Sequence, residues 1–347
     1  MTDVDVAILH AEPSEDAGPL TLATALARRT SAAAHRQGFL AAGATSARVV
    51  AGRADARSFG ARLRELAADL GAGGLIVLGS GAIPLATTAD RRELVEAAAA
   101  QTPRALTNNR YSADVVAIAR ARTALAALPD LATDNALPRW LEDAGVPVED
   151  RRARRRFGVD IDGPLDLVLL GGRWAAMLAD IDVAPARRAL ADVRAVTLDA
   201  SAELVVTGRV SAPNLRWLEE HTASRTRAIV EERGLRTRRA GQRPAASVLG
   251  ALLDADGPES LGTHLARLGD AAIVDSRVLL AHRFGADEAG WPAPEDRFAS
   301  DLSLPERIAD PWLRALTASA TEAPIPIVLG GHTLVGPGLR LALGGRR

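Results

Sequence analysis

The sequence predicts an α/β protein, and three observations lead to this expectation. Short apolar runs rich in Val, Ile and Leu alternate with longer Ala, Leu and Arg segments whose apolar residues recur at helical spacing. Glycine follows two of the apolar runs directly, at 75–78 and 325–329. The 347 residues are enough for two hydrophobic cores. We therefore expect helices layered on sheets, in two domains, 1–182 and 183–347.

In the first half, strands are expected at the apolar runs and helices at the longer segments between them. The expected strands are 4–9, 46–51, 75–78, 103–106 and 115–119. The expected helices are 20–42, as one helix or two, 56–70, a helix from about residue 90, 134–144, and 164–180. Pro164 suits the first turn of the last of these, with Gly163 or Asp162 as its cap.

The α/β pattern restarts after a boundary segment at 181–188. Strands are expected at 193–198, 203–206, 272–281 and 325–329. Helices are expected at 211–233, at 247–268 with an interruption around 254–258, and at 306–320. The polar segment 236–244 reads as a loop, and 284–305 as a long surface excursion.

Composition excludes several classes of chemistry. The 42 basic residues are all Arg, against 43 acidic residues, so the net charge of −1 argues against a polybasic nucleic-acid binder. Without Lys or Cys, the chain has no Schiff base, P-loop lysine, thiolate metal site or disulfide. The six His show no metal-ligand spacing. No apolar run approaches the ~20 residues of a membrane span and no secretory leader is evident, so we expect a cytoplasmic protein.

One short run combines two carboxylates with a helix start, at 159–167 (VDIDGPLDL). If its first residues end a strand, Asp160 and Asp162 share a face and could bind one Mg²⁺ that bridges to phosphate oxygens. Alternatively, Asp162 caps the following helix and Asp160 accepts backbone hydrogen bonds.

This run resembles the D-I/V-D-T-P-x-D-L signature of GT-A-fold nucleotidyltransferases, in the branch of phospholactate and molybdenum cofactor guanylyltransferases. Gly163 replaces the usual Thr. Pro84 and Leu85 match the D-x-P-L motif of the same family, whose Asp is absent here. The resemblance covers about 1–182. It implies a GT-A-like, Rossmann-like three-layer nucleotidyltransferase domain, followed by a second α/β domain for acceptor binding or dimerisation.

The loop at 10–18 departs from that family, because it is acidic where a Gly-rich basic loop would wrap the nucleotide phosphates. Two hypotheses therefore stand. The first is a nucleotidyltransferase, in which Mg²⁺ on catalytic Asp160 and Asp162 promotes transfer from a nucleoside triphosphate to a small phosphorylated acceptor. The second is a catalytically degenerate nucleotide-binding, regulatory or scaffold protein of the same fold. Neither needs a nucleic acid or a membrane as partner, and a homodimer is an open alternative.

Three further segments are candidate ligand contacts, each with a structural alternative. Gly79, Ser80 and Gly81 could bind an anion through backbone amides, or form a tight buried turn. Asn108 and Asn109 could bind base or sugar edges and Arg110 a phosphate, or the Asn side chains could simply cap a loop. The third segment, with Gly208, Arg209 and Ser211, joins a strand to a helix through a glycine turn. It could bind a phosphate or carboxylate at the helix start, or it could be an ordinary α/β connection.

Charged residues at three other places lead to further predictions. The basic run 151–156 reads as a solvated face, with a phosphate-binding patch as the alternative. Asp275 and Arg277 are expected to share a strand face and to pair. His332 follows two glycines at the end of a strand, where open sheets place their ligands.

Overall fold

The computed structural model describes residues 2–52, 57–68, 73–235 and 241–344. The chain forms two compact units. One consists of Met1–Asp16 and Ala25–Ile161, and the other of Ala17–Thr24 and Asp162–Arg347. The main division therefore lies between residues 161 and 162, earlier in the chain than the expected 182–183.

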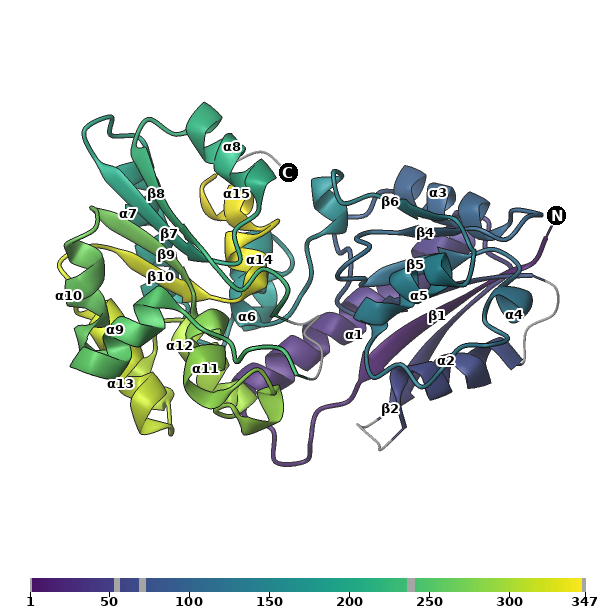
Figure 1. The fold of residues 1–347 in the computed structure, drawn as a ribbon, viewed down its shortest axis with the longest axis horizontal. Coiled ribbons are helices and arrows are strands. Elements are labelled where there is room, and N and C mark those ends of the chain that lie inside the picture. Colours follow the sequence, from purple (N-terminus) through teal and green to yellow (C-terminus); the bar gives the residue numbers. More distant parts are fainter. Residues whose placement is uncertain (1, 53–56, 69–72, 236–240, 345–347) are drawn as a thin grey trace. The chain divides into compact units, whose positions relative to one another are not determined.

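The first unit is built on a six-stranded sheet in the order β2-β1-β3-β5-β4-β6 (Figure 1). The strands are β1 (Val4–Ala11), β2 (Ser46–Gly52), β3 (Gly74–Gly79), β4 (Ala105–Thr107), β5 (Val115–Ile118) and β6 (Val148–Asp150). All neighbouring pairs are parallel except those of β5, which runs antiparallel to both β3 and β4. The C-terminal ends of β1, β2, β3, β4 and β6 therefore share one edge of the sheet.

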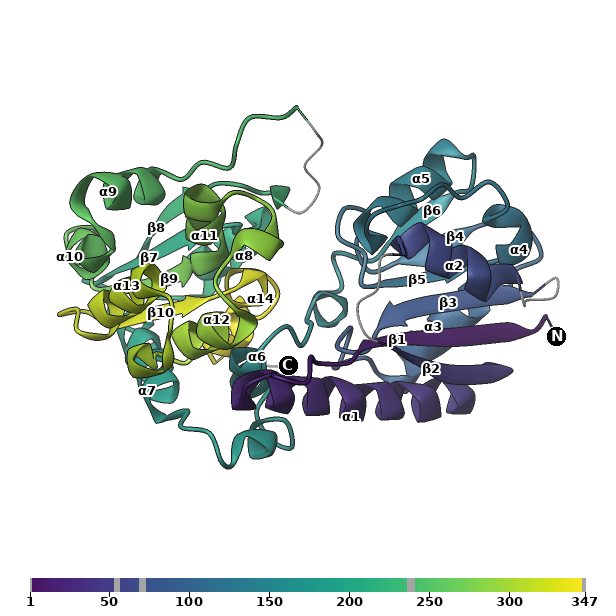
Figure 2. The same ribbon diagram turned by 90° about the horizontal axis from the view of Figure 1, so that it is seen from below.

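Helices cover both faces of this sheet, which confirms the layered α/β expectation (Figure 2). On one face, α1 (Pro19–Ala41) and α3 (Thr88–Ala98) pack on Val6, Ile8 and Leu78. On the other, Val77 and Ile118 pack against α2 (Phe59–Ala68), α4 (Ala121–Ala124) and α5 (Leu137–Asp143). Strands buried on both faces carry the continuous apolar runs seen in the sequence.

The second unit contains a four-stranded sheet in the order β10-β9-β7-β8, with every neighbouring pair parallel. Its strands are β7 (Glu203–Gly208), β8 (Arg225–Val230), β9 (Ala271–Asp275) and β10 (Ile327–Gly330). Helix α7 (Ala184–Thr197) contacts β7, β9 and β10. The remaining helices are α6 (Pro164–Leu170), α8 (Ala212–His221), α9 (Val248–Asp256), α10 (Leu261–Ala266), α11 (Ser276–Phe284), α12 (Pro294–Asp301), α13 (Pro311–Thr321), α14 (His332–Val335) and α15 (Leu339–Ala342).

Several predictions for the second half were wrong. The expected strand 193–198 is the end of α7, whose buried Ala186, Leu190, Val193 and Thr197 follow helical spacing. The expected helix 211–233 ends at His221, and its second half is the exposed edge strand β8. An edge strand that is exposed on both faces lacks the alternating apolar signal by which a strand is recognised.

Two other elements also end differently from the prediction. The strand expected at 272–281 ends at Asp275, and the chain continues as α11. Helix α6 stops at Leu170, not near residue 180, because Gly171 and Gly172 adopt positive φ values of 63° and 55°.

The segment 284–305 is not a surface excursion, since it contains α12, whose Asp296, Ala299, Ser300 and Asp301 are buried. The expected helix 56–70 is seen as α2, although residues 56, 69 and 70 lie outside the described ranges.

The N-terminus of α1 is held by a carboxylate from a distant helix. Glu295 of α12 accepts the backbone N–H groups of Leu20 and Thr21, each at 3.0 Å, and the Thr21 hydroxyl at 3.0 Å. Residues 17–24 and Glu295 belong to the same compact unit. The negative charge also opposes the positive end of the helix dipole, so Glu295 replaces a local cap.

We expect Glu295→Ala to lower the free energy of unfolding by about 1–3 kcal/mol, because it leaves two helix N–H groups and a hydroxyl without their acceptor. The matched control is Glu306→Ala, an exposed glutamate of the same unit, which should change stability by less than about 0.5 kcal/mol. Urea unfolding followed by circular dichroism measures both. Equal stability of the two variants would contradict the role of Glu295.

Candidate functional site

The first unit has a topological switch point between β1 and β3. The chain leaves β1 toward β2 on one side, and then returns to place β3 on the other side. In open α/β sheets, ligands bind at the C-terminal ends of two strands whose connections diverge in this way. His10 near the end of β1 and Ser80 after β3 lie at this point, where His10 Nδ1 is hydrogen-bonded to Ser80 Oγ at 3.1 Å, and both side chains are buried.

The loop after β3 is a tight turn that uses most of its own amides. Gly79 N–H donates to Asp114 O, Ser80 N–H to Leu9 O, and Ala82 N–H to Gly79 O. The amides of Gly79 and Ser80, two of the three predicted to bind an anion, are therefore directed at the protein. The buried-turn alternative describes the geometry.

The same turn holds an unusual backbone conformation. Ile83 is fully buried and has φ of 42°, a left-handed value that a β-branched residue rarely adopts. His35 of α1 fixes the preceding peptide, because its Nε2 donates to Ala82 O at 2.7 Å. Strain of this kind persists where the surrounding structure holds the backbone in place, and it often lies at binding sites.

Two arginines of α1 give the switch point a positive potential. Arg28 donates from Nε to Ile161 O at 2.7 Å, and its side chain lies beside Gly81. Arg29 is exposed, and within the described residues it forms no hydrogen bond or ion pair. Burial, followed by Arg28 and Arg29, lowers the pKa of His10 below 6.5, against a smaller opposing effect of Glu12. The two arginines therefore contribute positive potential at His10, which favours an anionic ligand.

The two aspartates singled out by the sequence separate between the units. Asp160 belongs to the first unit and Asp162 to the second. Asp160 bridges to Ala82 in the loop after β3, and its Oδ1 accepts the N–H of Ile161 at 2.8 Å. Gly163 is the N-cap of α6, as expected, but the capping carboxylate is Asp166, which accepts the N–H groups of Asp162 and Gly163.

These contacts do not fit one magnesium ion shared by Asp160 and Asp162. Asp160 already accepts a backbone N–H, and Asp162 contributes to raising the pKa of Arg277, so it lies within the field of a guanidinium. Magnesium prefers several unencumbered oxygen ligands in octahedral arrangement. Across the described ranges, no group of three or more His, Cys, Asp or Glu side chains is placed to hold a metal ion.

The turn after β4 is held by internal hydrogen bonds. Asn108 donates to Asp114 and to Phe157 O, and its Oδ1 accepts the N–H groups of Asp114 and Val115. Asn109 Oδ1 accepts the N–H of Tyr111 at 3.0 Å. Arg110 donates to Val148 O and pairs with Glu142 at 3.1 Å. The structural alternative therefore describes Asn108, Asn109 and Arg110 better than the predicted ligand contacts.

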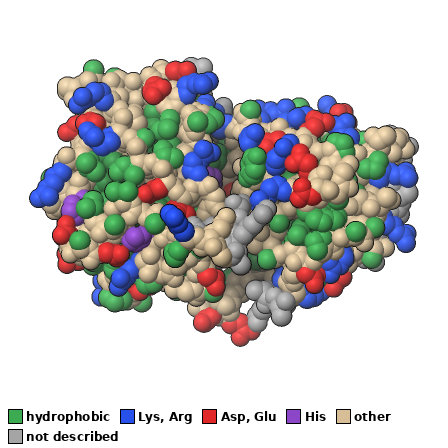
Figure 3. Space-filling model, in the orientation of Figure 1, with side chains coloured by type: hydrophobic (Ala, Val, Ile, Leu, Met, Phe, Trp, Pro, Cys, Tyr) green, Lys and Arg blue, Asp and Glu red, His purple; other side chains and the backbone are tan. Residues whose placement is uncertain are grey.

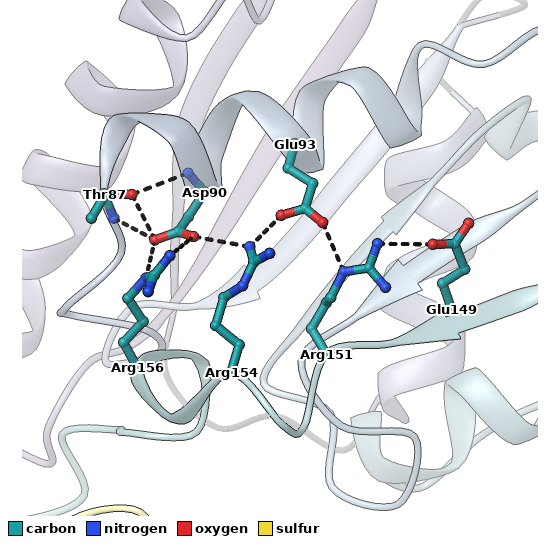
Figure 4. Close-up of polar contacts among 7 residues, drawn as sticks. All are labelled: Thr87, Asp90, Glu93, Glu149, Arg151, Arg154 and Arg156. Carbon is teal, nitrogen blue, oxygen red and sulfur yellow. Dashed lines mark hydrogen bonds and ion pairs between the residues drawn. The ribbon is translucent and has the colours of Figure 1, made fainter.

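In the basic run 151–156, Arg151, Arg154 and Arg156 pair with carboxylates of the chain and do not form a phosphate patch (Figure 4), whereas Arg152 is exposed. Asp90 of α3 is 1% exposed and accepts from Arg154 and Arg156. The second carboxylate of α3, Glu93, pairs with Arg151 and Arg154. Although burial alone would raise the pKa of Asp90, its hydrogen bonds to Arg156 and Thr87 hold that pKa well below the usual range. The run thus ties the segment after β6 to α3.

In the second unit, the predicted anion site is filled by a carboxylate of the chain itself. Asp275 at the end of β9 accepts from Arg209 through Nε at 2.6 Å, Nη2 at 2.9 Å and the backbone N–H at 3.3 Å. Gly208 has φ of 105°, and a Cβ there would collide with Asp275. Burial alone would raise the pKa of Asp275, but Arg209 outweighs it and lowers the pKa. Ser211 is the N-cap of α8, without a side-chain cap bond.

Asp275 and Arg277 do not pair, which corrects the prediction for these residues. The chain turns from strand to helix at Ser276, and Arg277 instead binds Asp301 of α12 through two contacts of 2.6 Å. His332 follows β10 and contributes to the low pKa of Asp275. The C-terminal ends of β7 and β9 are thus occupied by two buried arginine–aspartate pairs.

Asp275→Asn is expected to lower the free energy of unfolding by about 3–5 kcal/mol, since it leaves the buried Arg209 without a counter-charge. The control is Glu65→Gln, which breaks the exposed Arg57–Glu65 pair and should cost less than about 1 kcal/mol. Urea unfolding measures both. The double variant Arg209→Met/Asp275→Leu should lose less stability than Asp275→Asn, and a larger loss would contradict the charge explanation.

A second prediction concerns acid stability. Burial, followed by the charge of Arg91, lowers the pKa of His35 to about 4, while the bond to Ala82 O opposes the shift. In the unfolded chain His35 takes up a proton near its ordinary pKa of 6.5, so below that pH the unfolded state binds more protons. Between pH 7 and 5, His35 should therefore remove roughly 2 kcal/mol from the free energy of unfolding. His35→Gln retains a donor for Ala82 O but has no titrating ring, so its free energy of unfolding should fall less between pH 7 and 5. Urea unfolding at several pH values measures this, and equal pH slopes for wild type and His35→Gln would contradict the role of His35.

Sequence reasoning missed His10, Arg28 and Arg29. His10 stands near the end of an apolar strand, and the two adjacent arginines lie one helical turn beyond the segment 17–24. Charged residues on a helix are ordinarily read as a solvated face. Only the folded structure, in which the charges of Arg28 and Arg29 act on His10, distinguishes them from other arginines on a solvated helix face.

No family model and no curated protein matches the sequence. Among solved structures, the chain is similar to a Desulfovibrio desulfuricans protein assigned as a nucleotide-diphospho-sugar transferase, with 14% identity. That similarity covers 52% of this chain and 96% of the other, with a TM-score of 0.39, which is too low to support an argument. No helix in the described ranges has the length and apolar character needed to cross a bilayer.

Proposed function

We propose that this chain binds a nucleoside triphosphate at the C-terminal ends of β1 and β3, as a nucleotidyltransferase-like protein without a magnesium ion shared by Asp160 and Asp162. The observation that carries the proposal is the positive potential of Arg28 and Arg29 beside His10, at the switch point of the sheet. A triphosphate is a concentrated anion that guanidinium groups bind well.

Electrostatics elsewhere in the molecule supports this choice. Five other arginines at the predicted anion contacts pair with carboxylates of the chain: Arg110, Arg151, Arg154, Arg156 and Arg209. On the face drawn in Figure 3, basic and acidic side chains are interspersed, and neither sign forms a continuous patch. Arg29 differs because it is exposed and its charge acts on the buried His10, which is hydrogen-bonded to Ser80.

A second candidate function is nucleotidyl transfer to a small phosphorylated acceptor. The observation that favours it is the bridge between Asp160 and Ala82, which keeps a carboxylate next to the loop after β3. Magnesium dependence separates the two candidates. Nucleotide binding that requires Mg²⁺ and is lost in Asp160→Asn favours transfer, whereas binding that persists without Mg²⁺ favours the binding protein.

For the first candidate, Arg29→Gln should weaken nucleoside triphosphate binding roughly ten-fold, because it removes a charged contact to phosphate. The matched control is Arg36→Gln, which removes another exposed arginine of α1, two helical turns further from the switch point. Calorimetric titration with ATP and GTP, with and without Mg²⁺, gives the affinities. Equal affinities of the two variants would contradict the placement of the phosphates.

A further inference from the structure

Tyr111 is the chain's single tyrosine and the outlier among its aromatic side chains. It is 49% exposed, whereas the five Phe and five Trp are all buried or partly buried. Large aromatic side chains are ordinarily withdrawn from water, so one held at the surface is more informative than an exposed aliphatic residue. Tyr111 also lies in the loop after β4, at the sheet edge shared with the ends of β1 and β3.

An arginine from the neighbouring loop covers the tyrosine ring. The guanidinium carbon of Arg152 stands over the ring, 5.6 Å from its centroid, which is the geometry of a cation–π contact. Asp150, at the end of β6, connects the two loops. Its Oδ2 accepts the N–H of Arg110 at 3.2 Å, and its Oδ1 accepts the N–H of Arg152 at 2.7 Å.

The backbone that presents Tyr111 is fixed before any ligand arrives. Asn109 accepts the N–H of Tyr111, and Arg110 is anchored to Val148 O and Glu142. Asn108 is anchored in turn to Asp114 and to Phe157 O. These residues, predicted from the sequence as ligand contacts, form a rigid support for the residue that follows them. Such preorganisation reduces the entropy lost when a ligand binds.

The spacing of the sheet sets the distance between the end of β4, four residues before Tyr111, and the switch point. β4 and β3 are separated by one strand, and β4 and β1 by two. With neighbouring strands 4.7–4.9 Å apart, the end of β4 lies about 10 Å from that of β3 and about 14 Å from that of β1. This span is comparable with the distance between the base and the terminal phosphate of an extended nucleoside triphosphate.

We propose that Tyr111 and Arg152 form a stacking surface for the nucleobase of the bound nucleotide, whose phosphates lie at the ends of β1 and β3. The inference rests on the proposed function. The base stacks on the ring of Tyr111, while Arg152 supports that ring through its cation–π contact. Stacking uses the π face that every base has, so this surface does not distinguish purines by hydrogen bonds. ATP and GTP should therefore bind with similar affinity.

The test compares wild type, Tyr111→Ala and Tyr111→Phe by calorimetric titration with ATP, GTP and inorganic tripolyphosphate. Tripolyphosphate carries the three phosphate groups of the nucleotide but has no base. Tyr111→Ala should lose roughly 5- to 100-fold in affinity for both nucleotides and keep its affinity for tripolyphosphate, because only base stacking is removed. Tyr111→Phe retains the aromatic face and should stay within about two-fold of wild type for all three ligands.

Unchanged nucleotide affinity in Tyr111→Ala would overturn the stacking proposal while leaving the phosphate site intact. An equal loss for nucleotides and tripolyphosphate would also overturn it, since a base-specific contact cannot affect a ligand without a base. If wild type binds neither nucleotide nor tripolyphosphate, the proposed function fails, and the stacking surface fails with it. Thermal melting of each variant without ligand confirms that the protein is folded.

Discussion

Arginine–carboxylate pairing at the C-terminal ends of the strands is the interaction on which the loops of both units depend. A guanidinium always carries its charge, so a buried arginine requires a partner that supplies negative charge and acceptor atoms in a matching geometry. Asp275 does this for Arg209 and Asp301 for Arg277, while Asp90 and Glu93 of α3 pair with partly exposed arginines of the run after β6. In a chain with 42 arginines and 43 acidic residues, such pairs fix the segments that follow the strands.

Both sheets have a topological switch point, but different side chains occupy it. In each, the first strand has the second on one side and the third on the other, so both have a switch point. Between β7 and β9 that position is closed by the Arg209–Asp275 pair, in which backbone and side-chain donors converge on an internal carboxylate. Between β1 and β3 it holds the buried His10–Ser80 pair, whose histidine has its pKa lowered by burial and by the charges of Arg28 and Arg29. We therefore expect an external anion to be attracted more strongly to the switch point of the first unit than to that of the second.

Most of the first unit could be predicted from the sequence, whereas parts of the second could not. Strands buried on both faces, such as 75–78, have a continuous apolar signal that survives without knowledge of their neighbours. β8 lacks that signal because its residues face water on the sheet edge, and the end of α7 was mistaken for a strand because Val193, Val196 and Thr197 are β-branched. Local propensity was overridden there by packing on the sheet.

The sequence by itself determined the α/β class, the positions of most buried strands, the start of α6 at Pro164 and the exclusion of lysine and cysteine chemistry. Only the tertiary structure decided which charges are available to a ligand. Asp275 meets Arg209 across a separation of 66 residues, and Asp90 meets Arg156 across the same separation, so no local pattern reveals either pair. Whether an arginine binds a ligand or supports a loop depends on the carboxylate that folding brings to it, because a buried charge is stable only with its partner in place.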